Sequence, residues 1–381
     1  SVTKLSLLAY PSAGHALDIT APSGASSRCQ LPTPPARHPR SRAASATLSK
    51  KKGMPRRIIT VLGTAAALTA TMRPPVTLNA ASQRNAELAR QAATKQANDK
   101  GLLWLEHINI VVGDRQEAER FYFEEGLGCY RDPAKPGGPG TSGTMWANLG
   151  NQQFHLAQEE EDDPRQTIRG SVGLCLPDAE KAASRLEKFC DVQRHDDTRF
   201  TVTCPVGNIF HCYQVAKDPP TEGIGKRPKM VNLHKGDGYN GDAFSVRNGP
   251  GIRYVQFLVD DAQKAAQSYV DEFGGVVTQK DDLTCVAAGL GPVHLIFESS
   301  EPDPDADARQ DGVHLCVYVD AFSERYERLK KSARMFTNPR FRHLDTCDSL
   351  DEALASRTFR FAFPAVPFVE HETRALSHAQ F

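Results

Sequence analysis

The sequence lacks the short motifs on which several large enzyme classes depend. It has no G-x-x-x-x-G-K-[ST] loop for nucleotide phosphates, no G-x-S-x-G turn for a nucleophilic serine and no H-E-x-x-H helix for zinc. Its nine cysteines form no C-x-x-C pair, which excludes a zinc ribbon and a thioredoxin-like motif. These classes are therefore set aside before any residue is assigned a role.

Acidic residues are almost missing from the first hundred positions. Residues 1–100 carry 15 Lys and Arg against 3 Asp and Glu, which leaves 31 against 43 in residues 101–381. The net charge of zero thus combines a basic tail with an acidic remainder. The tail has a single aromatic residue, Tyr10, on which a base could stack, and the remainder has no excess of positive charge. We therefore expect no nucleic-acid partner and predict a small-molecule ligand.

The basic tail also lacks the apolar periodicity of a folded domain, so we predict that residues 1–100 form a disordered targeting tail. Arg56 and Arg57 precede an apolar run at 58–70, which is shorter than the roughly 20 residues of a bilayer span. A basic, acid-poor leader of this kind indicates an organelle, with a plastid favoured over a mitochondrion, and not an integral membrane protein. Because position 1 is not Met, the chain is either a fragment or processed form, or starts at Met54.

The cysteines favour a reducing compartment. Their number is odd, and Cys175, Cys212 and Cys316 lie in apolar, strand-like segments. A buried, reduced cysteine behaves as a small hydrophobic residue. We therefore predict free thiols in a stroma, a matrix or the cytosol.

One pattern occurs four times after residue 102. Each copy opens with an apolar strand, continues with a helix that an Asp precedes, and closes with short strands. The opening strands are predicted at 105–112, 171–176, 252–259 and 313–319. The residues before the helices are Asp114, Asp178, Asp261 and, in the fourth copy, Ala321.

This βαβββ unit resembles the vicinal oxygen chelate superfamily, which includes the glyoxalases and the extradiol dioxygenases. The resemblance covers about 103–381 and includes the closing segments 359–361 and 368–374. It implies an α+β fold in which four modules pair into two glyoxalase-like domains, because one module cannot bury both faces of its strands. In chain order these domains are 101–216 and 251–381, joined by a Gly- and Pro-rich linker at 217–250. The sequence leaves open whether modules pair within each half or exchange between the halves.

The resemblance also implies metal-ligand positions on the first and last strands of each module. Counting from the residue before each helix gives, module by module, His107 and Gln158, Ser171 and His211, Tyr254 and Phe297, and His314 and Glu370. The candidate ligands are therefore His107, Gln158, His211, His314 and Glu370. The expected cofactor is one divalent metal, namely zinc, nickel, iron or manganese.

Two functions from different classes are compatible with this reading. The first is a metal-dependent lyase or isomerase similar to lactoylglutathione lyase, acting on a small carbonyl compound or thiol adduct. A dioxygenase ranks below it, because the sequence shows no complete set of two His and one carboxylate. The second is a catalytically degenerate protein that binds a small apolar ligand or docks in an organelle assembly. A homodimer or a subunit of a larger assembly is compatible with both.

Overall fold

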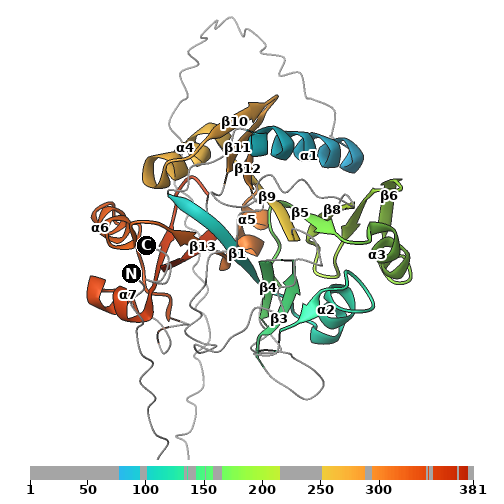
Figure 1. Cartoon of the computed structure of the whole chain (residues 1–381), viewed down its shortest axis with the longest axis horizontal. Helices are drawn as coiled ribbons and strands as arrows, with labels where there is room; N and C mark the ends of the chain where they lie inside the picture. The colour runs from blue at the N-terminus through green and yellow to red at the C-terminus, as the bar shows by residue number, and fades with distance from the viewer. Residues whose placement is uncertain are drawn as a thin grey trace, which may run out of the picture. The chain divides into compact units, whose positions relative to one another are not determined.

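The computed structural model describes residues 77–94, 101–132, 135, 143–150, 152–157, 165–214, 251–287, 294–339, 342, 346–366 and 369–375 (Figure 1). The predicted targeting run at 58–70, the linker 217–250 and the predicted ligand Gln158 lie outside these ranges. Among the described helices, none has the length and apolar character needed to cross a membrane.

The four predicted modules are present in the predicted order. The first comprises β1 (Leu102–Val111), α2 (Arg115–Tyr122), β2 (Tyr130–Arg131), β3 (Met145–Leu149) and β4 (Gln152–Ala157). The second comprises β5 (Gly170–Leu176), α3 (Ala179–Leu186), β6 (Val192–Asp196), β7 (Arg199–Thr203) and β8 (Ile209–Gln214). The third comprises β9 (Gly251–Val259), α4 (Ala262–Phe273), β10 (Val277–Lys280), β11 (Leu283–Ala287) and β12 (His294–Ser299). The fourth comprises β13 (Val313–Val319), α6 (Phe322–Lys331), α7 (Leu350–Ser356), β14 (Thr358–Ala362) and β15 (Val369–Ala375), and α5 (Pro304–Gln310) precedes it.

The predicted Asp residues cap three of the module helices. Asp114 accepts hydrogen bonds from the backbone N–H groups of Gln116 and Glu117, while Asp178 and Asp261 each accept one from the residue three positions on. The fourth helix begins after Ala321, which has a left-handed backbone (φ 43°) and no capping side chain. The α+β fold and its repeated module are therefore confirmed.

The strands form two sheets, and each sheet combines an outer and an inner module. The seven-stranded sheet has the order β14-β15-β13-β1-β4-β3-β2 and joins the first module to the fourth. The eight-stranded sheet has the order β10-β11-β12-β9-β5-β8-β7-β6 and joins the second to the third. Both junctions are antiparallel, β1 with β13 and β5 with β9. The ranges 101–216 and 251–381 thus each contribute strands to both sheets, so the modules exchange between the halves.

The two-residue period of the central strands separates the core from a polar face. Ile108 and Ile110 of β1 and Leu315 and Val317 of β13 belong to the main hydrophobic cluster. His314 and Cys316 alternate with these core residues on β13 and therefore fall on the opposite side of the sheet. This polar face of the seven-stranded sheet carries the candidate site.

The prediction of a disordered tail over 1–100 is wrong for its last part. Residues Leu78–Thr94 form the helix α1, which lies against β10 and β11 of the eight-stranded sheet (Figure 1). Ser82, Asn85, Leu88 and Ala92 are buried at helical spacing. Three of these four side chains are small or polar, so the apolar stripe that marks an amphipathic helix is weak in the sequence.

Candidate metal centre

Three strands of the seven-stranded sheet bring two histidines and a glutamate together. In the antiparallel pair β1–β13, His107 lies opposite Cys316 and Asn109 lies opposite His314. In the parallel pair β13–β15, Cys316 lies beside Glu372. Metal-binding atoms of His107, His314 and Glu372 all lie within 4.8 Å of one another, and all three side chains are buried.

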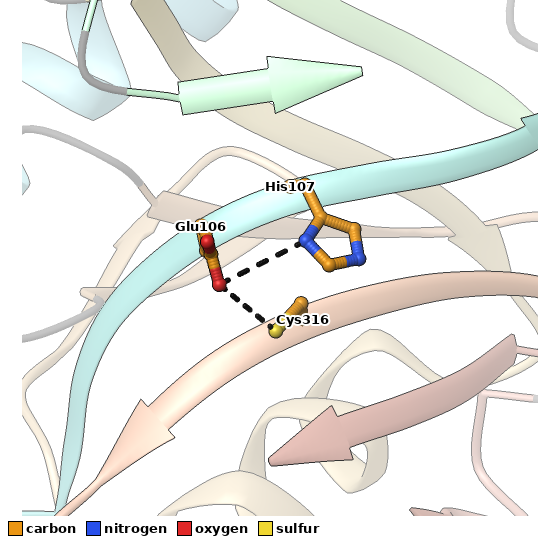
Figure 2. Close-up of side chains that lie close together, drawn as sticks. All are labelled: Glu106, His107 and Cys316. Atoms are coloured by element: carbon orange, nitrogen blue, oxygen red, sulfur yellow. Dashed lines mark hydrogen bonds and ion pairs between the residues drawn. The ribbon is translucent and has the colours of Figure 1, made fainter. Parts of the chain in front are cut away.

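A β-bulge in β1 adds a second carboxylate. Leu105 lies opposite Val317 and His107 opposite Cys316, so Glu106 is an extra residue in the register. Strict alternation would place neighbouring side chains on opposite faces, whereas Figure 2 shows Glu106 and His107 both directed toward Cys316. Glu106 Oε2 lies 3.9 Å from His107 Nδ1 and accepts a hydrogen bond from Cys316 Sγ at 3.5 Å. Glu106, His107 and Cys316 therefore form a second, overlapping group of potential ligands.

A buried ion pair orients Glu372. Arg360, on the neighbouring strand β14, donates from Nη2 to Glu372 Oε2 at 2.7 Å, and the two side chains are 3% and 7% exposed. The same oxygen lies 3.7 Å from His314 Nε2. The other oxygen, Oε1, accepts a hydrogen bond from Cys316 Sγ at 3.8 Å, so the guanidinium fixes the carboxylate beside both residues of β13.

A ring stack supports His107 from the other side. The His155 ring lies between the rings of His107 (centroids 3.6 Å apart) and Trp146 (4.4 Å). His155 Nε2 forms a hydrogen bond of 3.1 Å with Gln153 Oε1, and Gln153 Nε2 donates to Asp132 at 2.7 Å. The hydrogen bonds hold His155 in place, and its stacked ring in turn restricts the orientation of the His107 ring.

The chemistry of this donor set fits a divalent cation. Imidazole and carboxylate together suit iron, zinc, nickel or manganese. Ligand atoms bonded at about 2.0–2.2 Å in a tetrahedral arrangement would lie roughly 3.4 Å apart. Because the donor atoms lie within 4.8 Å of one another, side-chain adjustments of about 1.4 Å at most would bring each pair to that spacing.

The five predicted ligands fall into four different situations. His107 and His314 meet at the centre, with ring centroids 5.5 Å apart. Glu370 is the register partner of His314 in the parallel pair β13–β15 and comes two residues before Glu372. Gln158 falls outside the described residues.

His211 lies on β8 of the eight-stranded sheet, whereas His107 lies on β1 of the seven-stranded sheet. The two predicted ligands are therefore not brought together. Its Nδ1 shares a 2.8 Å hydrogen bond with Thr201 Oγ1. Burial, with His195 and Arg84 nearby, lowers the pKa of His211 to about 4, so the ring is neutral.

Sequence reasoning missed Glu372, Glu106 and Cys316. Glu372 could have been found, since the segment Glu370-His371-Glu372 offers two carboxylates of equal parity. Glu106 could not, because only the bulge brings its side chain to the polar face.

Comparisons with known proteins give structural similarity at low identity. No family model and no curated protein matches the chain. Glyoxalase I from Zea mays is 12% identical over 74% of this chain and 92% of its own, with a TM-score of 0.46. A Bacillus subtilis protein described as a dioxygenase is 16% identical over 72% of this chain and 86% of its own, with a TM-score of 0.45. An antibiotic-binding protein from Streptomyces is 22% identical over 29% of this chain and 94% of its own, with a TM-score of 0.23.

Values this low transfer no residue role, so the assignment rests on the topology of the chain itself. Four modules of strand, capped helix and strands recur along the chain. They pair through their first strands into two mixed sheets. This arrangement is the one that the resemblance implied, and the chain has the fold of the vicinal oxygen chelate superfamily.

Proposed function

We propose that the protein binds one divalent cation through His107, His314 and Glu372 and is a metal-dependent enzyme of the glyoxalase-like fold. The observation that carries this proposal is the approach of the three donor groups to within 4.8 Å in a buried site. Three protein ligands leave coordination positions for substrate oxygens, as catalytic metal sites require.

The ligand set favours an oxygenase over the lyase or isomerase that the sequence had favoured. Two imidazoles and one carboxylate are the donors of non-haem iron(II) oxygenases. The sequence alone did not show this triad, because its carboxylate is Glu372 and its two histidines come from opposite ends of the folded region. A bound iron(II) would supply Lewis acidity and redox chemistry with O₂ toward a substrate that chelates through two neighbouring oxygens. An oxygenase is therefore the first candidate.

The chain's own residues hold the donors in position. Arg360 fixes one oxygen of Glu372. The stack of His155 and Trp146 restrains the His107 ring. Preorganised donors of this kind avoid the cost of ordering side chains when the cation binds.

A lyase or isomerase is the second candidate, and Glu106 is the observation that favours it. Counting ligand positions along the sequence identified no carboxylate able to accept a proton beside His107. The bulge places Glu106 Oε2 3.9 Å from His107 Nδ1, in a position to accept a proton from a bound substrate. The small-molecule ligand, the plastid location and any assembly stay predictions from the sequence.

The test is the metal content of the full chain and of four variants. Mass spectrometry should find about one equivalent of metal per chain in the wild type. Binding should fall at least about tenfold in His107→Ala, His314→Ala and Glu372→Ala, because each variant removes one of three ligands. His195→Ala is the matched control, since it removes an imidazole bonded to Thr201 in the other sheet.

Substrate assays separate the two enzyme classes. With iron(II) and air, uptake of O₂ on addition of catechols would support the oxygenase. Isomerisation of a hemithioacetal with no O₂ uptake, lost in Glu106→Gln, would support the lyase or isomerase. Absence of metal binding to the wild-type chain would refute both and leave the predicted non-catalytic binding protein.

A further inference from the structure

The eight-stranded sheet has a polar patch at the position that corresponds to the metal centre. In the seven-stranded sheet, His107 and Cys316 are cross-strand partners on the two central strands. In the eight-stranded sheet, the two central strands are β5 and β9, and the corresponding partners there are Ser171 and Gln256. Glu298 of β12 lies next to them, with its Oε2 accepting a 2.6 Å hydrogen bond from Gln256 Nε2. In the third module, the residues at the position of the metal centre are thus Gln256 and Glu298. Counting along the sequence had instead given Tyr254 and Phe297.

Helix α1 inserts two polar side chains into this patch. Arg84 Nη2 donates to Glu298 Oε2 at 2.7 Å, and its Nη1 reaches Asp282 at 3.2 Å. Asn85 Nδ2 donates to Gln256 Oε1 at 2.8 Å, the same oxygen that accepts from Ser171 at 2.6 Å. The guanidinium of Arg84 therefore contacts the carboxylates of Glu298 and Asp282, and the amide of Asn85 contacts the amide of Gln256.

The rest of α1 has an apolar seat on the same face. Leu88, Ala89 and Ala92 form a hydrophobic cluster with side chains of five strands, distinct from the main core. The sheet members of this cluster are Cys175, Tyr213, Tyr254, Leu283, Cys285 and Ile296. Tyr213 also donates to the Ser82 carbonyl at 2.8 Å, which anchors the first half of the helix.

The fit of α1 leaves two buried polar atoms unsatisfied. Arg84 Nε and Asn85 Oδ1 are buried, yet neither makes a hydrogen bond within the described part of the chain. An open groove of about 860 Å³ runs along the helix, and Arg84, Arg199, Arg253 and Lys280 are among its lining residues. A permanent core element would be expected to satisfy the polar atoms that it buries.

We propose that this patch is a second binding site, selective for a guanidinium group that a short helix presents, and that α1 occupies it from within the same chain. Glu298 and Asp282 recognise the guanidinium, Gln256 recognises the neighbouring amide, and the cluster around Tyr213 and Tyr254 accepts the apolar side of the helix. The site is independent of the proposed metal centre, and none of its tests requires metal or turnover.

The first test is chemical rescue in the full-length chain. Arg84→Ala should lower the midpoint of thermal unfolding by about 5 °C or more, since it leaves Glu298 without its cation. Ethylguanidinium at millimolar concentration should raise that midpoint by about 2 °C or more while leaving the wild type unchanged, and urea, its uncharged analogue, should not. Arg120→Ala is the control, because it removes an equal charge from an exposed pair with Glu125. Equal responses of Arg84→Ala and Arg120→Ala to ethylguanidinium would overturn the proposal.

The second test asks whether a helix can enter from outside. A fluorescent peptide of residues 77–94 should bind full-length Arg84→Ala at least tenfold more tightly than it binds the wild type, whose site is filled. The same peptide with Arg84→Ala should bind neither protein, whereas Gln83→Ala, a change at an exposed position, should leave binding intact. Binding that ignores the peptide's arginine would refute the guanidinium selectivity.

Glu298→Gln tests the same contact from the sheet if Arg84→Ala does not fold. Hydrogen exchange of the α1 amides should then be at least tenfold faster than in the wild type, with β9 and β12 unchanged. Exchange of α1 at the rate of the sheet in both proteins would show that α1 is part of the core, and the proposal would fail.

Discussion

Replacing Arg360 by methionine should strongly destabilise the protein, because it removes the guanidinium that pairs with the buried Glu372 carboxylate. The two side chains are 3% and 7% exposed and 2.7 Å apart, so solvent screens the pair very little. Removing one member of a buried ion pair costs about 3–5 kcal/mol. At about 2–4 °C per kcal/mol for a folded region of this size, the midpoint of thermal unfolding should fall by roughly 10 °C.

Two further measurements separate this effect from a loss of packing. The double variant Arg360→Met with Glu372→Gln should recover more than half of the loss, since an amide replaces the buried charge. A divalent metal at about 100 times its dissociation constant should restore about 2.7 kcal/mol to Arg360→Met alone, because it binds only the folded state. Calorimetry on the full chain measures both.

The control is Arg120→Met, which breaks the pair with Glu125 at side-chain exposures of 49% and 69%. An exposed pair contributes about 0–1 kcal/mol, so the unfolding midpoint of this variant should move by about 4 °C at most. If Arg360→Met melted within the same few degrees as this control, the reasoning about a buried, charged Glu372 would be refuted.

Three other predictions concern the scaffold. Ala321→Gly should raise the free energy of unfolding by about 1 kcal/mol, because glycine adopts the left-handed backbone at φ 43° without the strain of a side chain; an unchanged or lower value in urea unfolding would contradict this. Burial lowers the pKa of His294 to about 3, so the unfolded chain binds a proton that the folded chain does not between about pH 6.5 and pH 3. The contribution of His294 to the free energy of unfolding is therefore complete above about pH 6.5 and is lost as the pH decreases, by about 2 kcal/mol between pH 7 and pH 5. Urea titrations of His294→Phe should show a smaller loss of stability over that interval. Among the described cysteines, Cys190 is half-buried and the others are buried, so maleimide should label Cys190 first, and Cys190→Ser should remove the fast phase seen by mass spectrometry.

Much of the local structure could be predicted from the sequence. The alternation in 313–319 matches β13, and the Asp residues at 114, 178 and 261 cap helices as expected. These features depend on contacts within a few residues, so the local pattern contains the information they need. His107 and His314 were also found, because their distance from the helix start places them on a known strand position.

The partners of these residues could not be predicted. All four modules have the same local pattern, so the sequence satisfies pairing within each half as well as the observed exchange between halves. The pairing depends on which strand edges bury the most surface together, a property of residues that are about 200 positions apart. The grouping of His107 with His211 was therefore replaced by His107 with His314 and Glu372.

By itself, the sequence determined the module, its number of copies, the helix caps and the two histidines of the centre, because each follows from spacing along one segment. Only the tertiary structure decided which modules share a sheet, that one extra residue in β1 turns Glu106 toward the polar face, and that α1 covers the second sheet. The physical reason is the same in each case. A register shift of one residue or a choice between equivalent edges leaves the local pattern unchanged, and long-range packing alone distinguishes the outcomes.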